Sequence, residues 1–149
     1  MALQSEGQNM NIQKMDKIIQ TVADSVIGES GIWQFKYKET FMMIMTDEKY
    51  NRMRIISPIL EQEKLDKSEM IRLLEANYHT VLDTKYALSE DILWAVFIHP
   101  LKELTENQFI NAISQVYFSA TTYGTSYNST GLLFGSQVPA DEENPLKKN

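Results

Sequence analysis

The sequence predicts an α+β domain in which one helix is followed by three strands, a second helix, two strands and a last helix. Apolar residues recur at helical spacing in three segments, and apolar and polar residues alternate in several of the stretches between them. Short polar turns separate consecutive strands, so the five strands are expected to form an antiparallel sheet. A length of 149 residues fits one domain, and three helices on so short a chain can cover only one face of the sheet.

The first helix is predicted over residues 12–26. Gly28 and Gly31 follow it and are expected to end it. Its apolar side chains lie on one stripe, at Ile12, Met15, Ile18, Ile19, Val22 and Val26.

Three strands are predicted next, at 32–37, 40–46 and 50–57. Lys38-Glu39 is expected to form a two-residue turn, and Pro58 is expected to end the third strand because it has no N–H to donate. With that turn, one side of the sheet collects an apolar core set from the three strands. The set consists of Trp33, Phe35, Tyr37, Met42, Ile44, Met53 and Ile55.

The second half begins with a connector over residues 58–66 and a short helix over 67–76. Two strands, at 81–88 and 92–99, follow and are joined by a Glu90-Asp91 turn.

The last helix has the strongest start signal in the chain. Thr105 and Gln108 match a capping box, Leu104 and Phe109 match a hydrophobic staple, and Gly124 marks the end.

Two strand segments, 41–45 and 92–98, are apolar on both faces, whereas a sheet with one wet face normally alternates. We therefore expect surplus apolar surface on the side away from the helices, of the size that marks an interaction site. The alternative is an intramolecular cover by Leu132 to Phe134 or by the connector at Ile59 and Leu60. The predicted partner-binding residues are Phe41, Met43, Met45, Trp94, Val96 and Ile98.

No catalytic or cofactor constellation is present, so we expect a noncatalytic protein without a cofactor. The only histidines, His79 and His99, have no second histidine or cysteine at ligand spacing, so no metal site is predicted. The net charge of -6 argues against nucleic-acid binding, and no apolar run is long enough to span a membrane. With no cysteine and no signal peptide, a cytoplasmic location is expected.

The order of elements over residues 11–124 resembles the type III secretion chaperone-like fold, which includes the Tir chaperone family and the putative bacterial sensory transduction regulator family. The resemblance also rests on the helix end at 73–77, Leu-Leu-Glu-Ala-Asn, and on Leu104-Thr105-Glu106 at the entry to the last helix. It implies a curved sheet with the first and last helices on one face. It also implies a bacterial, noncatalytic protein that holds an extended segment of a partner, often as a homodimer.

By position, the resemblance implies a dimer interface on the middle helix, at Met70, Leu73, Leu74 and Asn77, beside the strand that ends at Ile98. The domain is then expected to span 11–124, with a flexible N-terminus over 1–10 and a mostly disordered tail over 125–149.

The leading hypothesis is thus a chaperone-like module that binds a protein or peptide client on apolar sheet and helix surface. The alternative is a regulatory or small-ligand-binding domain with a pocket between helix and sheet, lined by Trp33, Tyr37, Tyr86 and Trp94.

Overall fold

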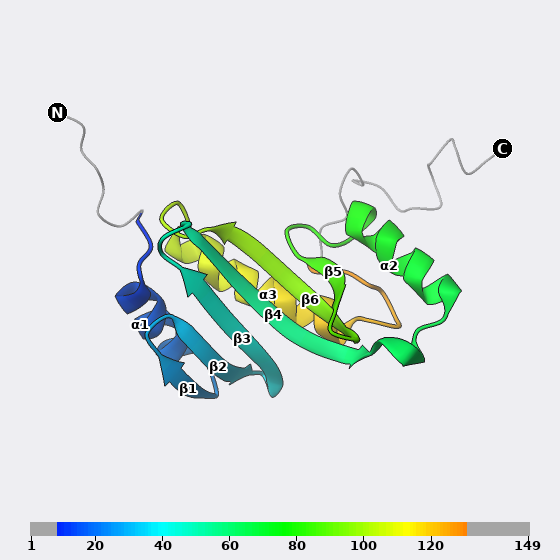
Figure 1. Cartoon of the computed structure of the whole chain (residues 1–149), viewed down its shortest axis with the longest axis horizontal. Coiled ribbons are helices and arrows are strands. Elements are labelled where there is room, and N and C mark those ends of the chain that lie inside the picture. Colours follow the sequence, from blue (N-terminus) through cyan, green and yellow to red (C-terminus); the bar gives the residue numbers. More distant parts are fainter. Residues whose placement is uncertain (1–8, 131–149) are drawn as a thin grey trace.

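The computed structural model describes residues 9–130, in which three α-helices accompany one six-stranded antiparallel sheet (Figure 1). The strands lie in the order β1-β2-β3-β4-β6-β5. The helices are α1 (Ile12–Val22), α2 (Lys67–His79) and α3 (Glu106–Thr121), and a short 3-10 helix, η2 (Gln62–Lys64), precedes α2. The strands are β1 (Ser25–Glu29), β2 (Ile32–Tyr37), β3 (Thr40–Asp47), β4 (Arg52–Glu61), β5 (Lys85–Ser89) and β6 (Ile92–Pro100).

The α+β class is confirmed, but the prediction of five strands and of three strands after the first helix was wrong. Helix α1 ends at Val22, and the last two residues expected to complete it, Ser25 and Val26, begin the edge strand β1. Val26 fits both patterns, because it continues the helical stripe and also points inward from a strand, opposite Phe35. Gly28 lies in β1 at φ +115°, and a Cβ there would meet the Ile32 carbonyl oxygen at 2.4 Å.

Both predicted two-residue turns are present. Lys38 and Glu39 have φ of 48° and 66°, and Glu90 and Asp91 have φ of 50° and 62°, as a type I′ turn requires. The predicted register of the first hairpin is confirmed, since Trp33 pairs with Ile44 and Phe35 with Met42. These turns form without the usual glycine or asparagine, so the pairing of the strands holds them in the left-handed region.

Strand β4 passes through Pro58, which corrects the prediction that proline ends it. The strand continues to Glu61, with a register shift between Pro58 and Leu60. Pairing with β3 stops at Ile56, so at Pro58 the strand has a neighbour only on its β6 side. A proline is tolerated there because an edge-like position beside a bulge does not need its N–H.

Other boundaries differ by a few residues. Helix α2 runs three residues further than predicted, to His79, and β5 begins at Lys85 rather than at residue 81. The predicted start of α3 is confirmed: Thr105 Oγ1 accepts from the Gln108 N–H, and the Gln108 side chain accepts from the Thr105 N–H. Helix α2 has an equivalent capping box at Asp66 and Glu69.

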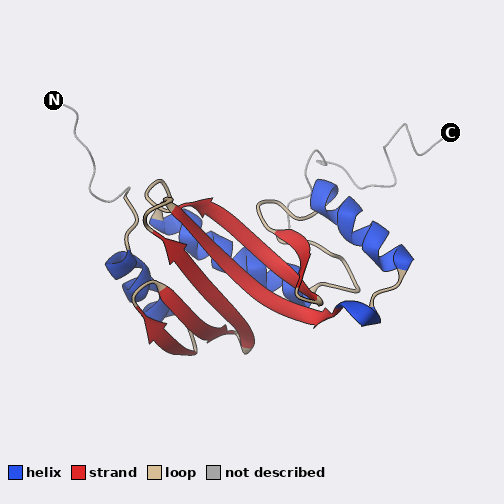
Figure 2. Cartoon of the chain, in the orientation of Figure 1, coloured by secondary structure: helices blue, strands red, loops and turns tan. Residues whose placement is uncertain are grey.

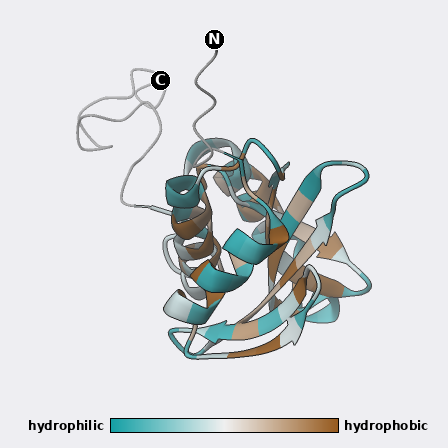
Figure 3. Cartoon of the chain, turned by 90° about the vertical axis from the view of Figure 1, so that its left-hand side faces the viewer, coloured by the Kyte–Doolittle hydropathy of each residue, from teal (hydrophilic) through white to brown (hydrophobic). Residues whose placement is uncertain are grey.

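Helices α1 and α3 lie together on one face of the sheet, as Figures 1 and 2 show. We call this the inner face and the opposite one the outer face. Hydrophobic and hydrophilic residues alternate along both strands and helices (Figure 3). The main hydrophobic core lies between α1, α3 and the sheet. Its largest fully buried side chains include Trp33, Phe109, Met15, Ile19, Met42, Ile44, Met53 and Ile55.

Helix α2 packs at the other end of the molecule, against a second cluster. Residues 125–130, part of the predicted tail, pack there too: Tyr127 is buried, and Ser129 Oγ accepts from the Leu82 N–H at 2.7 Å. The remainder of the predicted tail and residues 1–8 lie outside the described residues. The buried members of the cluster are Leu65, Leu73, Ala76, Val81, Tyr86, Leu93 and Tyr127.

Candidate protein-binding surface

The outer face carries a continuous apolar band across its central strands. Met43 on β3 pairs with Ile56 on β4, and Ile56 pairs in turn with Val96 on β6. Since alternate residues of a strand point to opposite faces, these side chains share the face that α1 and α3 leave uncovered. The apolar band comprises Ile32, Phe41, Met43, Met45, Ile56, Pro58, Trp94, Val96 and Ile98.

All six predicted partner-binding residues lie in this band. Phe41 is 39 % exposed and Ile98 is 53 % exposed, while Met43, Met45, Trp94 and Val96 are half-buried. The Trp94 indole is anchored at one edge of the band, where Nε1 donates to the Ser89 carbonyl at 3.1 Å. Their role in binding stays a prediction, and residues 9–130 leave these side chains partly exposed. Ile32 and Ile56 also belong to the band, and the period-two pattern of their strands is the signal that places them there.

Two oppositely charged regions lie at the two ends of this band. Arg52 and Arg54 point to the outer face from the start of β4, where Arg54 pairs with Met45 on one side and Ile98 on the other. At the far end of β4, a hollow of about 620 Å³ opens beside η2 and the start of α2. We call it the acidic hollow, and its lining consists of Glu61, Gln62, Glu63, Met70, Glu90, Asp91 and Ile92.

Helix α2 presents a second apolar surface, a stripe of Ile71, Leu74 and Tyr78 that we call the α2 stripe. Leu74 is 70 % exposed and Tyr78 is 81 % exposed. The helical repeat places residues at such spacing on one side. The stripe therefore faces away from the cluster that holds α2 to the sheet.

The predicted dimer residues divide between these two sides of α2. Leu74 is in the α2 stripe and Met70 is half-buried at the acidic hollow. Leu73 is buried in the chain's own cluster. The Asn77 side chain donates to the Tyr86 carbonyl at 3.1 Å and accepts from the Tyr86 N–H at 2.8 Å, so it joins α2 to β5. Ile71 and Tyr78 belong to the α2 stripe but were not among the predicted dimer residues, and the role of all of these residues in pairing stays a prediction.

A smaller cavity of about 390 Å³ lies between the β5–β6 pair and the start of α3. Lys85 is part of the lining, and its Nζ donates to the Val81, Leu82 and Thr84 carbonyls. Burial lowers the pKa of the Lys85 ammonium. The cavity is lined by Leu82, Asp83, Lys85, Phe97, Ile98, His99, Gln108 and Asn111.

The four aromatic residues predicted to line a pocket do not come together. Trp33 is buried on the inner face, with Nε1 donating to Asp16 Oδ1 at 3.0 Å, whereas Trp94 lies on the outer face. Tyr86 is buried in the α2 cluster and donates to the Ser119 carbonyl at 2.7 Å. Tyr37 packs edge-on against Tyr117, with the ring centroids 5.6 Å apart.

The two histidines lie apart and contact aromatic rings. His79 meets Tyr78 edge-on at 4.7 Å between centroids, and His99 stacks on Phe97 at 5.8 Å. Across residues 9–130, no group of three or more histidine, cysteine, aspartate or glutamate side chains is arranged to hold a metal ion. None of the helices in this same stretch has the length and apolar character needed to cross a membrane.

Comparison with known proteins finds a likeness in structure. No protein-family model matches the chain, and no curated protein matches it either. A chain of the solved HopA1-SchA chaperone-effector complex superposes with a TM-score of 0.57 at 11% sequence identity, covering 75% of this chain and 92% of that chain. The two chains therefore share a fold.

Proposed function

We propose that this protein is a noncatalytic, chaperone-like binding module that holds an extended segment of a partner protein on its outer face. The observation that carries the proposal is the apolar band on the uncovered face of the sheet. The structural neighbour, which comes from a chaperone-effector complex, supports the proposal at the level of the fold.

Burial energetics favour a protein partner for the apolar band. Fully burying one large apolar side chain is worth roughly 1.5–3 kcal/mol, and several members of the band are only partly buried. Ile32, Ile98 and Phe41 are the most favourable targets, because among the members of the band they are the most exposed. An extended segment matches the band because every second side chain of such a segment points to one side.

The proposal includes a homodimer formed through the α2 stripe. Tyr78 and Leu74 are among the most exposed large apolar side chains in residues 9–130, and a helix side of this kind packs readily against a copy of itself. We further place the protein in the bacterial cytoplasm. The cysteine-free sequence is compatible with a reducing compartment.

The binding proposal is tested with a pair of double variants. Phe41→Ser with Ile98→Ser removes the two most exposed of the predicted partner-binding side chains, while Phe118→Ser with Ile110→Ser removes the same two residue types, of similar exposure, from α3. Partner protein captured from the native lysate is digested while bound, and the protected segment is synthesised. We expect that segment to lose at least tenfold in affinity for the outer-face variant and to bind the α3 variant like the wild type. Equal affinity for both variants would place the client elsewhere.

The homodimer has its own test. Leu74→Asp should convert a species of twice the chain mass into a single chain in size-exclusion chromatography with light scattering. Arg72→Gln, an exposed change on the same helix, should leave the mass unchanged. A wild-type protein that runs as a single chain at high micromolar concentration would refute the dimer.

The alternative function, binding of a small ligand, is favoured by one observation, the 390 Å³ cavity with Asp83, His99 and Asn111 in its lining. A small-molecule thermal-shift screen tests it. A ligand that raises the melting temperature of the wild type but not of Asn111→Leu would support this function over a protein client.

A further inference from the structure

We infer that the outer face selects a partner segment with opposite charges at its two ends: an acidic side chain, an apolar stretch, and a basic side chain about six residues away. This rests on the proposed function and specifies the chemistry of the client. The inference comes from the placement of charge around the apolar band.

The basic end of the band contains an arginine whose cross-strand neighbours are apolar. Arg54 is exposed, and its direct cross-strand neighbours are Met45 and Ile98. Within the described part of the chain it has no hydrogen bond and no ion pair. Arg52, two residues earlier, donates from Nη1 to the Asn51 carbonyl at 2.8 Å and lies opposite Asp47. An apolar partner that covers the band would desolvate the Arg54 guanidinium, so the covering segment needs a carboxylate beside it.

The acidic end is continuous with the same face. Glu61 pairs with Ile92 across β4 and β6, and both residues line the acidic hollow together with Glu63, Glu90 and Asp91. In residues 9–130 the one salt bridge at this end joins Glu61 to Lys64 at 3.9 Å between two exposed side chains, a pair of little energetic value. Four carboxylates around one hollow favour a basic side chain of the partner.

The distance between the ends follows from the strand that joins them. Strand β4 separates Arg54 from Glu61 by seven residues. The register shift between Pro58 and Leu60 adds one residue to β4, and the paired strand β6 covers the same interval in six residues, from Ile98 to Ile92. At about 3.3 Å per residue this is about 20 Å. An extended partner also spans it in six residues, because an even spacing keeps both charged side chains pointing to the sheet. Ile56, Trp94 and Val96 lie in this interval, so the partner side chains that point to the sheet between the two charges must be apolar.

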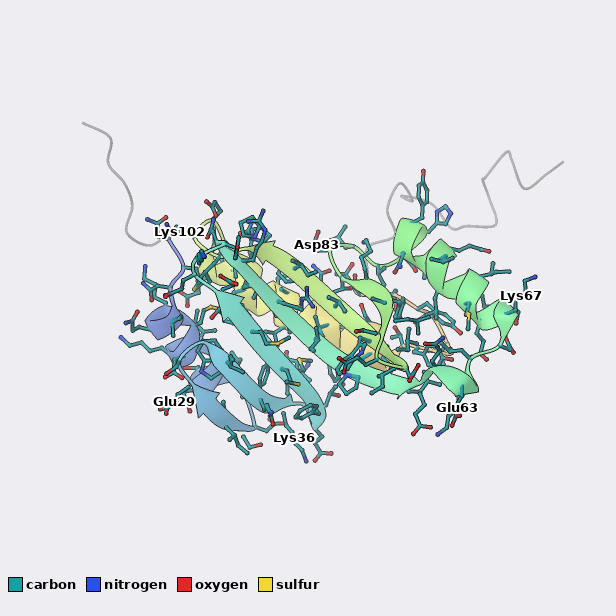
Figure 4. The ribbon with its side chains drawn as sticks, in the orientation of Figure 1. Glu29, Lys36, Glu63, Lys67, Asp83 and Lys102 are labelled. Carbon is teal, nitrogen blue, oxygen red and sulfur yellow. The ribbon has the colours of Figure 1, made fainter. Side chains whose placement is uncertain are left out.

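Figure 4 labels two of the charged side chains around the sheet, Glu63 and Lys36. Glu63 lies at the α2 end of the sheet, beyond the end of β4, whereas Lys36 lies on β2, well away from it. Lys36 pairs across β2 and β3 with Phe41, so a second cation borders the apolar band on its β2 side, four residues along β3 from the Met45 that pairs with Arg54.

The test uses four synthetic peptides with one host sequence of alternating valine and serine, capped at both ends. Two valine positions six residues apart carry Glu and Lys, Glu and Glu, Lys and Lys, or Gln and Gln, so that both charges lie on the valine side of the extended peptide. Affinities for the full chain are measured by fluorescence anisotropy at low and high salt. We expect the Glu–Lys peptide to bind most tightly, about three- to tenfold tighter than the Gln–Gln peptide, with the difference shrinking at high salt.

Variants assign each charge to its end of the band. Arg54→Gln should remove the preference for Glu over Gln, and Glu61→Gln with Glu90→Gln should remove the preference for Lys over Gln. Arg72→Gln on α2 removes an exposed arginine outside the band and should change neither preference. Stronger binding of the Glu–Glu or Lys–Lys peptide would overturn the inference.

Two other results separate this inference from the function on which it rests. Equal binding of all four peptides, with a loss for the Phe41→Ser, Ile98→Ser variant, would overturn the charge selection and leave the binding function intact. No binding of any peptide at millimolar concentration would overturn both. Binding to a chain that ends at Thr130, but not to the full chain, would replace an outside partner with the chain's own C-terminal residues.

Discussion

The two faces of the sheet are made by the same strands and differ in what covers them. On β3, Ile44 is fully buried under the helices, while the next residue along the strand, Met45, stays half-buried on the outer face. Both residues are large and apolar, so their chemistry does not distinguish the faces. The comparison shows that hydrophobicity in a strand indicates burial only when a second layer is available to provide it.

The two faces also differ in whether their polar side chains have hydrogen-bond partners within the protein. On and around the inner face, polar side chains form hydrogen bonds with one another. The Thr84 and Ser119 hydroxyls lie 2.5 Å apart, and the Gln115 side chain donates to Asp83 Oδ2 at 2.9 Å. On the outer face Arg54 lies among apolar neighbours without a partner in residues 9–130. Paired polar groups are typical of a buried core, whereas the exposed Arg54 guanidinium is left to water.

The largest expected effect comes from truncating neighbouring residues on opposite faces. Ile44→Ala should lower the free energy of unfolding by about 2–5 kcal/mol, because the helices leave a cavity over the missing atoms. Met43→Ala, the preceding residue on the outer face, should cost less than about 1 kcal/mol. Urea denaturation followed by circular dichroism measures both. Equal losses would show that the outer face is sealed within one chain.

A smaller effect is expected from the polar pairs of the inner side. Ser119→Ala leaves the buried Thr84 hydroxyl without its partner and should lower the free energy of unfolding by about 1–3 kcal/mol. Ser25→Ala, at an exposed position on the outer face of β1, should stay within about 0.5 kcal/mol. The same denaturation experiment compares them, and a Ser119→Ala variant as stable as Ser25→Ala would contradict the contrast between the faces.

The smallest effect appears only at alkaline pH. Burial beneath α2 raises the pKa of the Tyr86 hydroxyl to about 12. Because the folded pKa lies above the unfolded value near ~10, the stabilisation is complete below pH ~10 and is lost as pH rises through about 12. Tyr86→Phe has no such group, so the difference in free energy of unfolding between wild type and variant should shrink over this range. A difference independent of pH would show that Tyr86 ionises as freely when folded as when unfolded.

Much of the local structure was predictable because its causes are local. Capping at Thr105 depends on residues within one turn, and the turn at Lys38-Glu39 sets the register of its hairpin directly. The identity of the apolar band was predictable for the same reason, since the turn determines which side chains share a face. Two predictions were wrong. Val26 was assigned to the first helix because it satisfies a helical and a strand pattern equally. Pro58 was expected to end its strand, but the strand tolerates a proline there because its pairing with β3 has already stopped.

The sequence by itself determined the class of fold, the strand register of the hairpins and the set of residues on each face, because turns, caps and periodicity act over a few residues. Only the tertiary structure decided that β1 extends the sheet, that Leu73 and Asn77 hold α2 to the chain's own core, and that charges of opposite sign lie at the two ends of one apolar band. These features join residues far apart in the chain, and such contacts depend on how the layers pack rather than on any local pattern.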